Sequence, residues 1–133
     1  MTIELRIDPY PGNDALNALM ASAWGNGPRD FSPILSRSLA HVGAFDDQRL
    51  IGFVNVAWDG GIHAFIIDTC VDPDFRRQGI ATALVETAKR LAGERGAEWL
   101  HVDFEPHLIG FYRKLGFAPT EAGVMKLLNH SRF

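Results

Sequence analysis

Apolar and polar residues alternate over residues 2–8, which is typical of a half-buried β-strand. Residues 14–24 instead carry apolar side chains every three or four positions, which predicts a helix packed on one face. Asn13 is a suitable residue to cap the start of that helix. A second, short helix is expected from Pro33, with Ser32 as its cap. The chain should therefore begin as a strand followed by two helices.

The middle of the chain has the pattern of strands. Residues 40–45 and 50–58 are apolar and rich in β-branched side chains, and the intervening residues 46–49 have the composition of a hairpin turn. Residues 63–71 are apolar on both faces around their centre, which is typical of a central strand. Three strands in succession predict an antiparallel sheet.

The C-terminal half alternates helical and strand patterns. A strand, a helix and a second strand in this order should form a right-handed crossover between parallel neighbours, so we expect a mixed α/β (α+β) sheet and not a doubly wound one. The expected elements after the third strand are a helix (80–95), a strand (98–104), a helix (106–115) and a closing hairpin (117–119 and 124–128), followed by a loose tail (129–133).

Length and charge exclude several classes of protein. The 133 residues suffice for one domain, which we place at residues 1–133, and 47% of them are hydrophobic. The formal net charge is -3, so binding to nucleic acid through phosphate neutralisation is not expected. No apolar run approaches the roughly 20 residues that span a bilayer, so no membrane association is expected.

The cysteine content and the N-terminal sequence indicate the cellular compartment of the protein. Cys70 is the single cysteine, so a disulfide within the chain is impossible, as befits a reducing environment. The first residues lack the charged-then-apolar pattern of a signal peptide. We therefore expect a cytoplasmic protein.

Residues 71–82 join the third strand to the helix that follows it. The start of a helix exposes backbone N–H groups without partners and carries a partial positive charge. This chain adds Arg76, Arg77 and the small residue Gly79 at that point. Such a loop is suited to hold an anion, most simply a phosphate or pyrophosphate.

Two motifs together resemble a known family. The spacing Arg76-x-x-Gly79-x-Ala81 resembles the signature with which the GNAT superfamily of N-acetyltransferases holds the pyrophosphate of acetyl-CoA. Residues 111–117 (Phe-Tyr-Arg-Lys-Leu-Gly-Phe) resemble the other signature of that superfamily. The two motifs and the strand between them cover residues 66–117. Before residue 40 the resemblance is weak.

The resemblance implies a fold and a co-substrate. The fold would be a mixed, mostly antiparallel sheet of six to seven strands flanked by about four helices. That sheet would be splayed open between strands 63–71 and 98–104. Acetyl-CoA would be the co-substrate, with no metal. The implied acetyl-CoA contacts are Thr69, Cys70, Val71, Arg76, Arg77, Gln78, Gly79, Ile80, Ala81, Thr82, Glu105, Phe111 and Tyr112.

Tyr112 corresponds to the tyrosine that protonates the departing thiolate in many members of the superfamily. A thiolate leaves a thioester more easily when it receives a proton, so an acid at this position is chemically sensible. The alternative is a tyrosine that only packs at the edge of the core.

At the position of the base, the chain departs from the common pattern of the superfamily. Where some members carry a glutamate, this chain reads Leu-His-Val-Asp, so His101 takes that place and Asp103 would share its face of the strand. Asp68 interrupts the apolar central strand and is a second candidate base, since a carboxylate there must be paired or face a cleft. Glu105 stands near the position of a common asparagine. Cys70 is expected to pack and not to act as a nucleophile.

The sequence contains few signals for the acceptor substrate. We expect direct attack of a primary amine, of a small molecule or a peptide, on acetyl-CoA. Trp24, Phe31 and Trp58 are candidates for an acceptor pocket but are more typical of core residues. A cationic amine would be attracted by four acidic residues, Asp59, Asp68, Asp103 and Glu105.

The alternative functions are a catalytically weak acyl-CoA-binding or sensor module and a protein that binds another phosphate compound. A homodimer is compatible with an exposed sheet edge.

Overall fold

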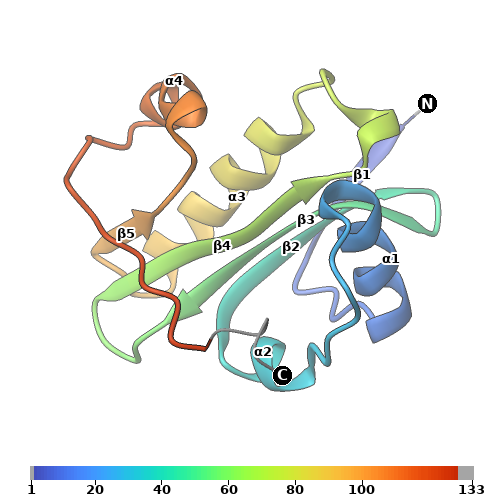
Figure 1. Cartoon of the computed structure of the whole chain (residues 1–133), viewed down its shortest axis with the longest axis horizontal. Coiled ribbons are helices and arrows are strands. Elements are labelled where there is room, and N and C mark those ends of the chain that lie inside the picture. Colours follow the sequence, from blue (N-terminus) through green and yellow to red (C-terminus); the bar gives the residue numbers. More distant parts are fainter. Residues whose placement is uncertain (1, 129–133) are drawn as a thin grey trace. The chain divides into compact units, whose positions relative to one another are not determined.

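The computed structural model describes residues 2–128. The chain divides into two compact units, Met1–Val102 and Asp103–Phe133. The first unit contains the sheet, with strand order β1-β2-β3-β4-β5 (Figure 1). Its elements are β1 (Ile3–Ile7), α1 (Asn13–Trp24), α2 (Ser32–Ser36), β2 (Ser38–Asp46), β3 (Arg49–Trp58), β4 (His63–Val71), the 3-10 turn η1 (Pro73–Phe75), α3 (Ile80–Glu94) and β5 (Trp99–Val102). The second unit contains the 3-10 turn η2 (Pro106–Leu108) and α4 (Ile109–Lys114).

The sheet is mixed and mostly antiparallel, as the pattern predicts. Strands β1 to β4 pair antiparallel with their neighbours, and β4 pairs with β5 in parallel. The parallel pairs run from His63 opposite Trp99 to Ile66 opposite Val102, so residues 67–71 of β4 extend beyond the last pair. The end of β4 leads directly into residues 72–79, the loop that is predicted to hold an anion.

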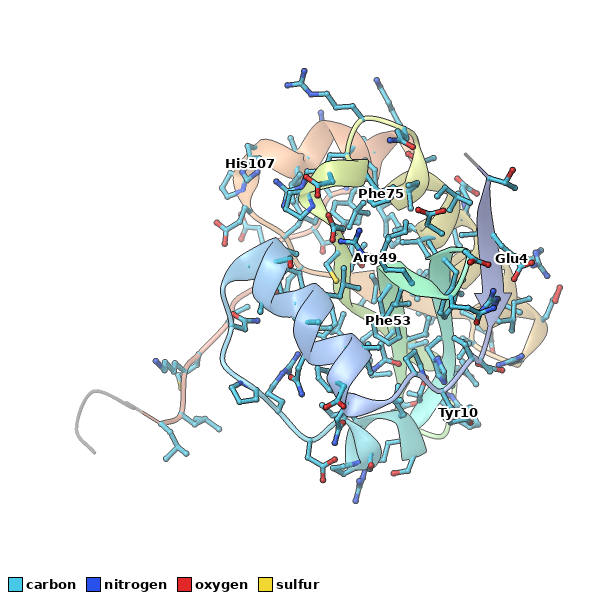
Figure 2. All side chains as sticks on the ribbon, turned by 90° about the vertical axis from the view of Figure 1, so that its right-hand side faces the viewer. Glu4, Tyr10, Arg49, Phe53, Phe75 and His107 are labelled. Carbon is cyan, nitrogen blue, oxygen red and sulfur yellow. The ribbon has the colours of Figure 1, made fainter. Side chains whose placement is uncertain are left out.

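The two faces of the sheet are covered by different helices. On one face, α1 and α2 form a core with side chains of the sheet, and Phe53 lies between α1 and the strands (Figure 2). On the other face, α3 packs closely on β3, because Gly52 has no side chain. A Cβ at Gly52 would lie 3.1 Å from Leu84 Cδ1 and 3.3 Å from Ile80 Cγ2. The α1-side core comprises Leu16, Leu19, Met20, Phe31, Leu35, Phe45, Leu50, Phe53 and Cys70.

The expected cap of α1 is wrong. The helix begins at Asn13 itself, after Gly12, and no side chain caps it. The Asn13 amide bonds instead to the loop before α2, since its Oδ1 accepts from the Phe31 N–H at 2.9 Å and its Nδ2 donates to Asp30 Oδ1 at 3.1 Å. Asn13 therefore fixes the loop that connects α1 to α2.

The predicted closing hairpin is wrong, and the sheet has five strands instead of six to seven. No strand follows β5 in the part of the chain that the structure describes. Val124 and Leu127 are 82% and 86% exposed, so the apolar run 124–128 has no sheet to pack on. Strand propensity depends on a paired neighbour and a covered face, and this run has neither. The predicted tail 129–133 lies outside the described residues.

The ends of the last elements also differ from expectation. The strand predicted at residues 98–104 ends at Val102, and the helix predicted at 106–115 divides into η2 and α4. Gly116, with φ of 101°, follows α4 and ends it as expected. The count of about four helices is confirmed by α1 to α4. No helix within residues 2–128 is both long and apolar enough to cross a membrane.

His41 is a buried titratable residue within the sheet. It is 1% exposed, and neither ring nitrogen has a hydrogen-bond partner among the described residues. Its ring packs edge-on against Tyr10, with the centroids 4.6 Å apart. Burial lowers the pKa of His41 below its ordinary value. Asp8 opposes this shift and Arg95 adds to it.

We expect His41 to make stability depend on pH. The unfolded chain, with a histidine pKa of about 6.5, takes up the proton more readily than the folded chain. The contribution of His41 is therefore fully present above about pH 6.5 and is lost as the pH falls below it, by at most about 1.4 kcal/mol per pH unit. In urea unfolding at several pH values, His41→Phe should flatten this slope. The matched change His107→Phe, at an exposed histidine, should preserve it; equal slopes in His41→Phe and the parent would contradict the assignment.

Candidate functional site

The loop between β4 and α3 exposes the N-terminal end of α3. Gly79 precedes the helix with φ of 77°, a left-handed conformation that suits glycine, and no side chain caps the helix. A Cβ at Gly79 would meet no atom within 4 Å, so the space in front of the helix end is open. Uncapped N–H groups facing open space are suited to bind an anion.

The two arginines of the loop differ in their contacts. Arg76 Nη2 donates to the carbonyl of Ala23 at 3.4 Å. Arg77 adopts φ of 63°, and its side chain is exposed and forms no hydrogen bond or ion pair with any residue of the described range. A left-handed non-glycine residue is uncommon and often marks a functional loop. The positive charge of Arg77 is thus available to a ligand.

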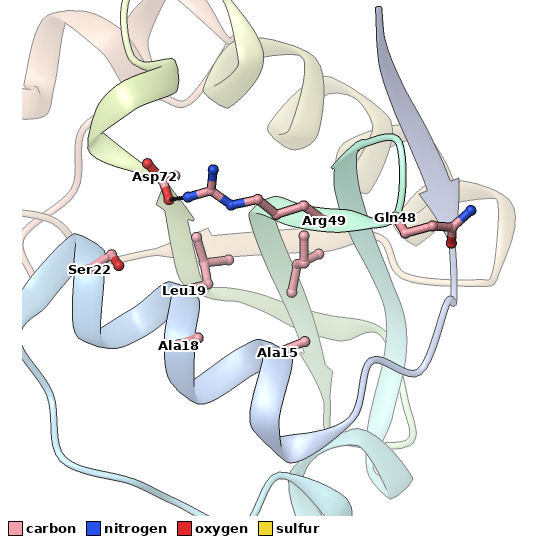
Figure 3. Close-up of a pocket in the computed structure, with 8 residues that line it drawn as sticks. Ala15, Ala18, Leu19, Ser22, Gln48, Arg49 and Asp72 are labelled. Atoms are coloured by element: carbon pink, nitrogen blue, oxygen red, sulfur yellow. Dashed lines mark hydrogen bonds and ion pairs between the residues drawn. The ribbon is translucent and has the colours of Figure 1, made fainter.

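Asp72 fixes the start of this loop from a buried position. Its Oδ1 accepts from the Asp74 N–H at 2.9 Å, and its Oδ2 accepts from Arg49 Nη2 at 2.8 Å, drawn as a dashed line in Figure 3. The Asp72 side chain is 6% exposed and that of Arg49 is 58% exposed. The pair borders a cavity of about 200 Å³, and no predicted catalytic residue lines it. The cavity is lined by Ala15, Ala18, Leu19, Ser22, Gln48, Arg49, Leu50 and Asp72.

We expect Asp72→Ala to destabilise the protein by about 2–3 kcal/mol, since it removes the cap of η1 and the buried partner of Arg49. Urea unfolding measures the change. Asp74→Ala is the matched control, because Asp74 is exposed and only its backbone N–H takes part in the cap. A loss below about 0.5 kcal/mol in Asp72→Ala, the range of ordinary surface changes, would show that the contacts of Asp72 are not structural.

Strand β4 is irregular just before the loop. Phe53 pairs with Cys70 and Asn55 with Ile67, so Val54 of β3 faces two residues, Asp68 and Thr69. This is a β-bulge, and Asp68 has φ of 56°. The Thr69 Oγ1 is buried and has no hydrogen-bond partner among the described residues. Bulges are common beside active sites, and a buried polar atom without a partner is costly unless a ligand or water satisfies it.

Cys70 lies next to this bulge in the α1-side core. Burial raises the pKa of its thiol to about 12, and the Asp68 carboxylate adds to the rise. The thiolate is the reactive form of cysteine, so this thiol is a poor nucleophile. The expectation that Cys70 packs agrees with this environment.

Asp68 has a partner that the sequence pattern does not indicate. Arg29, in the loop between α1 and α2, donates from Nη2 to Asp68 Oδ1 at 3.4 Å. Asp68 is therefore not an isolated carboxylate. It is an ion-paired group at the bulge.

His101 also has an unforeseen partner. His63 Nδ1 lies 2.9 Å from His101 Nε2, so one of the two nitrogens must donate and the other accept. The His101 ring stacks on Phe65, with centroids 4.7 Å apart, as their pairing across β4 and β5 requires. No group of three or more His, Cys, Asp or Glu side chains within the described residues is arranged to hold a metal ion.

Tyr112 belongs to the second unit and lies in an aromatic cluster. It stacks on Phe104 at 4.6 Å and meets Phe111 and Phe117 edge-on at 4.9 and 5.7 Å. The residue is buried. These contacts fix the orientation of the ring.

A family model now identifies the chain. The model described as the acetyltransferase (GNAT) family matches residues 4–117. The chain belongs to the GNAT acetyltransferase family. The family resemblance based on the two motifs is thereby confirmed.

Relatives and solved structures of GNAT acetyltransferases agree with this assignment. GCN5-related N-acetyltransferase 1 of Arabidopsis thaliana is 29% identical over 117 residues, which cover 84% of this chain and 58% of the relative. A probable acetyltransferase of unknown function from Staphylococcus aureus has the same fold, with a TM-score of 0.81 and 24% identity over 96% of this chain and 100% of that one. An aminoglycoside N-acetyltransferase in complex with CoA aligns at a TM-score of 0.72 and 23% identity, over 94% of this chain and 93% of that one. The chain spans about half the length of the curated relatives it matches.

The structure places the predicted site residues of this GNAT-family chain in two groups. The first unit contains Asp68, His101 and the predicted acetyl-CoA contacts from residue 69 to 82, and the second contains Glu105, Phe111 and Tyr112. Asp103 lies beyond the end of β5, so it does not share a strand face with His101. Trp24 and Trp58 are exposed, so the expectation that they are core residues is wrong. Phe31 is buried, as expected of a core residue.

Proposed function

We propose that the protein transfers the acetyl group of acetyl-CoA to a primary amine. The observation that carries this proposal is the uncapped N-terminal end of α3 behind Gly79, in a chain of the GNAT acetyltransferase family. The open space at Gly79 and the unpaired charge of Arg77 suit a pyrophosphate. CoA carries a pyrophosphate, and the comparison structure solved with CoA has the same fold.

The loop and the bulge would hold the two parts of acetyl-CoA. Backbone N–H groups from Arg77 to Thr82 would receive the pyrophosphate, with Arg77 adding charge. The bulge would receive the thioester end, since the buried Thr69 Oγ1 lacks a partner there. Residues 67–71 extend beyond the last β5 pair, so this edge of β4 is free of a β5 partner next to the bulge.

The reaction needs an acid and a base. The amine nitrogen forms a bond to the acetyl carbonyl carbon, the bond from that carbon to sulfur breaks, and the thiolate receives a proton. We assign Tyr112 as the donor of that proton, on the basis of the family motif and the fixed position of its ring. The products are an N-acetylated amine and free CoA.

The ammonium form of the amine must first lose a proton. His101, hydrogen-bonded to His63, is the proposed acceptor, because a neutral imidazole takes up a proton near neutral pH. His101 lies opposite Phe65, which is three residues before Asp68 on β4. Three residues correspond to ~10 Å along a strand, so His101 would not touch an amine at the Asp68 bulge directly. The proton would therefore pass from the amine to His101 through water. Asp68 is the alternative base, and its pairing with Arg29 favours a role in binding the ammonium group.

A binding module that has lost turnover is the alternative function. Calorimetry with acetyl-CoA and thiol release with a panel of primary amines separate the two. The proposal predicts acetyl-CoA binding together with thiol release that depends on an amine. Tight binding without turnover for any amine would favour the module, and no thermal stabilisation by acetyl-CoA would exclude both.

A further inference from the structure

Two opposite charges lie side by side at the bulge of β4. Asp68 supplies a carboxylate whose side chain is 18% exposed, and Arg29 supplies a guanidinium whose side chain is 41% exposed. Their 3.4 Å contact is long for a charged hydrogen bond and joins one nitrogen to one oxygen. The contact uses Asp68 Oδ1 and does not involve Oδ2.

Arg29 is held in place before any ligand arrives. Its backbone N–H donates to Asn17 Oδ1 at 2.8 Å, and its carbonyl accepts from Asn17 Nδ2 at 2.9 Å. Its guanidinium lies 4.7 Å from the centre of the Phe31 ring, and its Nη2 lies 3.2 Å from the Met20 sulfur. The position of this charge is therefore set by α1 and by the core, which lowers the entropic cost of binding a ligand.

Much of the guanidinium is still available. Its hydrogen bonds to Met20 and Asp68 both use Nη2, although a guanidinium has five N–H donors. Nε and Nη1 keep their N–H donors, and each of these nitrogens can donate a single hydrogen bond to a carboxylate oxygen. A ligand carboxylate can thus bind Arg29 through Nε or Nη1 without displacing Asp68.

We propose that the acceptor is a free α-amino acid, with its carboxylate on Arg29 and its ammonium group on Asp68. This inference rests on the proposed acetyl transfer and names its acceptor class. An α-amino acid carries its two opposite charges one carbon apart, which suits the adjacent Arg29 and Asp68. A polyamine would bring a second positive charge toward Arg29, and a peptide N-terminus has no carboxylate beside its ammonium group.

The adjoining face of the sheet indicates the kind of side chain. Asn55 shares a face of β3 with the core residue Phe53, and Ile67 pairs with Asn55, so Ile67 and Phe65 lie on the α1 side of the sheet. They are 37% and 38% exposed beside the Asp68 bulge. An apolar or aromatic side chain would bury this surface, so phenylalanine is a suitable probe.

The test compares three probes that share one ring: L-phenylalanine, L-phenylalaninamide and phenethylamine. Thiol release should give a kcat/KM for L-phenylalanine at least about tenfold above both others, since a hydrogen-bonded charge pair supplies such a factor. Arg29→Ala should reduce this preference to less than about threefold, and Arg29→Lys should retain part of it. Arg90→Ala, at an exposed arginine of α3, is the matched control and should keep the preference.

Calorimetry with the CoA-bound protein separates this inference from the proposed function. Binding of L-phenylalanine that is lost in Arg29→Ala supports an amino-acid site at Arg29, and the absence of any acetylated amine would then overturn the proposed function and the acceptor role but not the site. Acetylation without preference for the amino acid, or a preference that survives in Arg29→Ala, overturns the inference and leaves acetyl transfer in place. Thermal melting of each variant shows that it is folded, and the comparison of probes on the parent protein needs no variant.

Discussion

Replacing Tyr112 by phenylalanine should lower kcat by about 100-fold, because the departing thiolate would lose its proton donor. The phenylalanine ring keeps the contacts of Tyr112 with Phe104, Phe111 and Phe117, so the second unit should stay folded. The affinity for acetyl-CoA should change little. Steady-state thiol release gives kcat, and calorimetry gives the affinity.

The control is Tyr10→Phe, which makes the same change at an exposed tyrosine of the first unit. It should leave kcat unchanged. A kcat of Tyr112→Phe within twofold of the parent would refute the acid role. A lower melting temperature together with weaker acetyl-CoA binding would show that the Tyr112 hydroxyl is structural.

The second large effect is expected for Gly79→Val. At φ of 77° a β-branched side chain is strained, at a cost of about 1–3 kcal/mol. Its methyl groups would also enter the space in front of α3, where no atom lies within 4 Å of a Cβ. We expect the Kd of acetyl-CoA to rise by at least about 30-fold, since the strain and the lost backbone contacts act together.

Gly93→Val is the matched control for this change. Gly93 is exposed near the other end of α3, and a Cβ there also meets open space, but its φ is not positive. Its acetyl-CoA affinity should equal that of the parent. If Gly79→Val and Gly93→Val bind acetyl-CoA equally well, the N-terminal end of α3 is not the pyrophosphate site.

The sequence predicts those features that depend on neighbouring residues. Strand His63–Val71 has the predicted bounds and α3 starts at the predicted Ile80, because an apolar run and a glycine next to a helical pattern are local signals. The uncapped start of α3 behind Gly79 follows from the same signals. Membership in the GNAT family can also be predicted from the sequence, because each of its two motifs is a short run of neighbouring residues.

The remaining features depend on contacts between distant residues. The bulge at Asp68 exists only relative to Val54 on β3, so the pattern of β4 alone cannot show it. Arg29 and Asp68 are 39 positions apart, and His63 and His101 are 38 apart. The run 124–128 has the composition of a strand, but strand formation also requires an edge to pair with.

Transfer of a labelled acetyl group tests the central claim most directly. The protein is incubated with acetyl-CoA labelled in its acetyl group and with a mixture of primary amines that includes L-phenylalanine, and the products are resolved by mass. The account predicts labelled N-acetylated amine in a one-to-one ratio with free CoA. Free CoA with labelled acetate and no acetylated amine, or no consumption of acetyl-CoA at all, would contradict it.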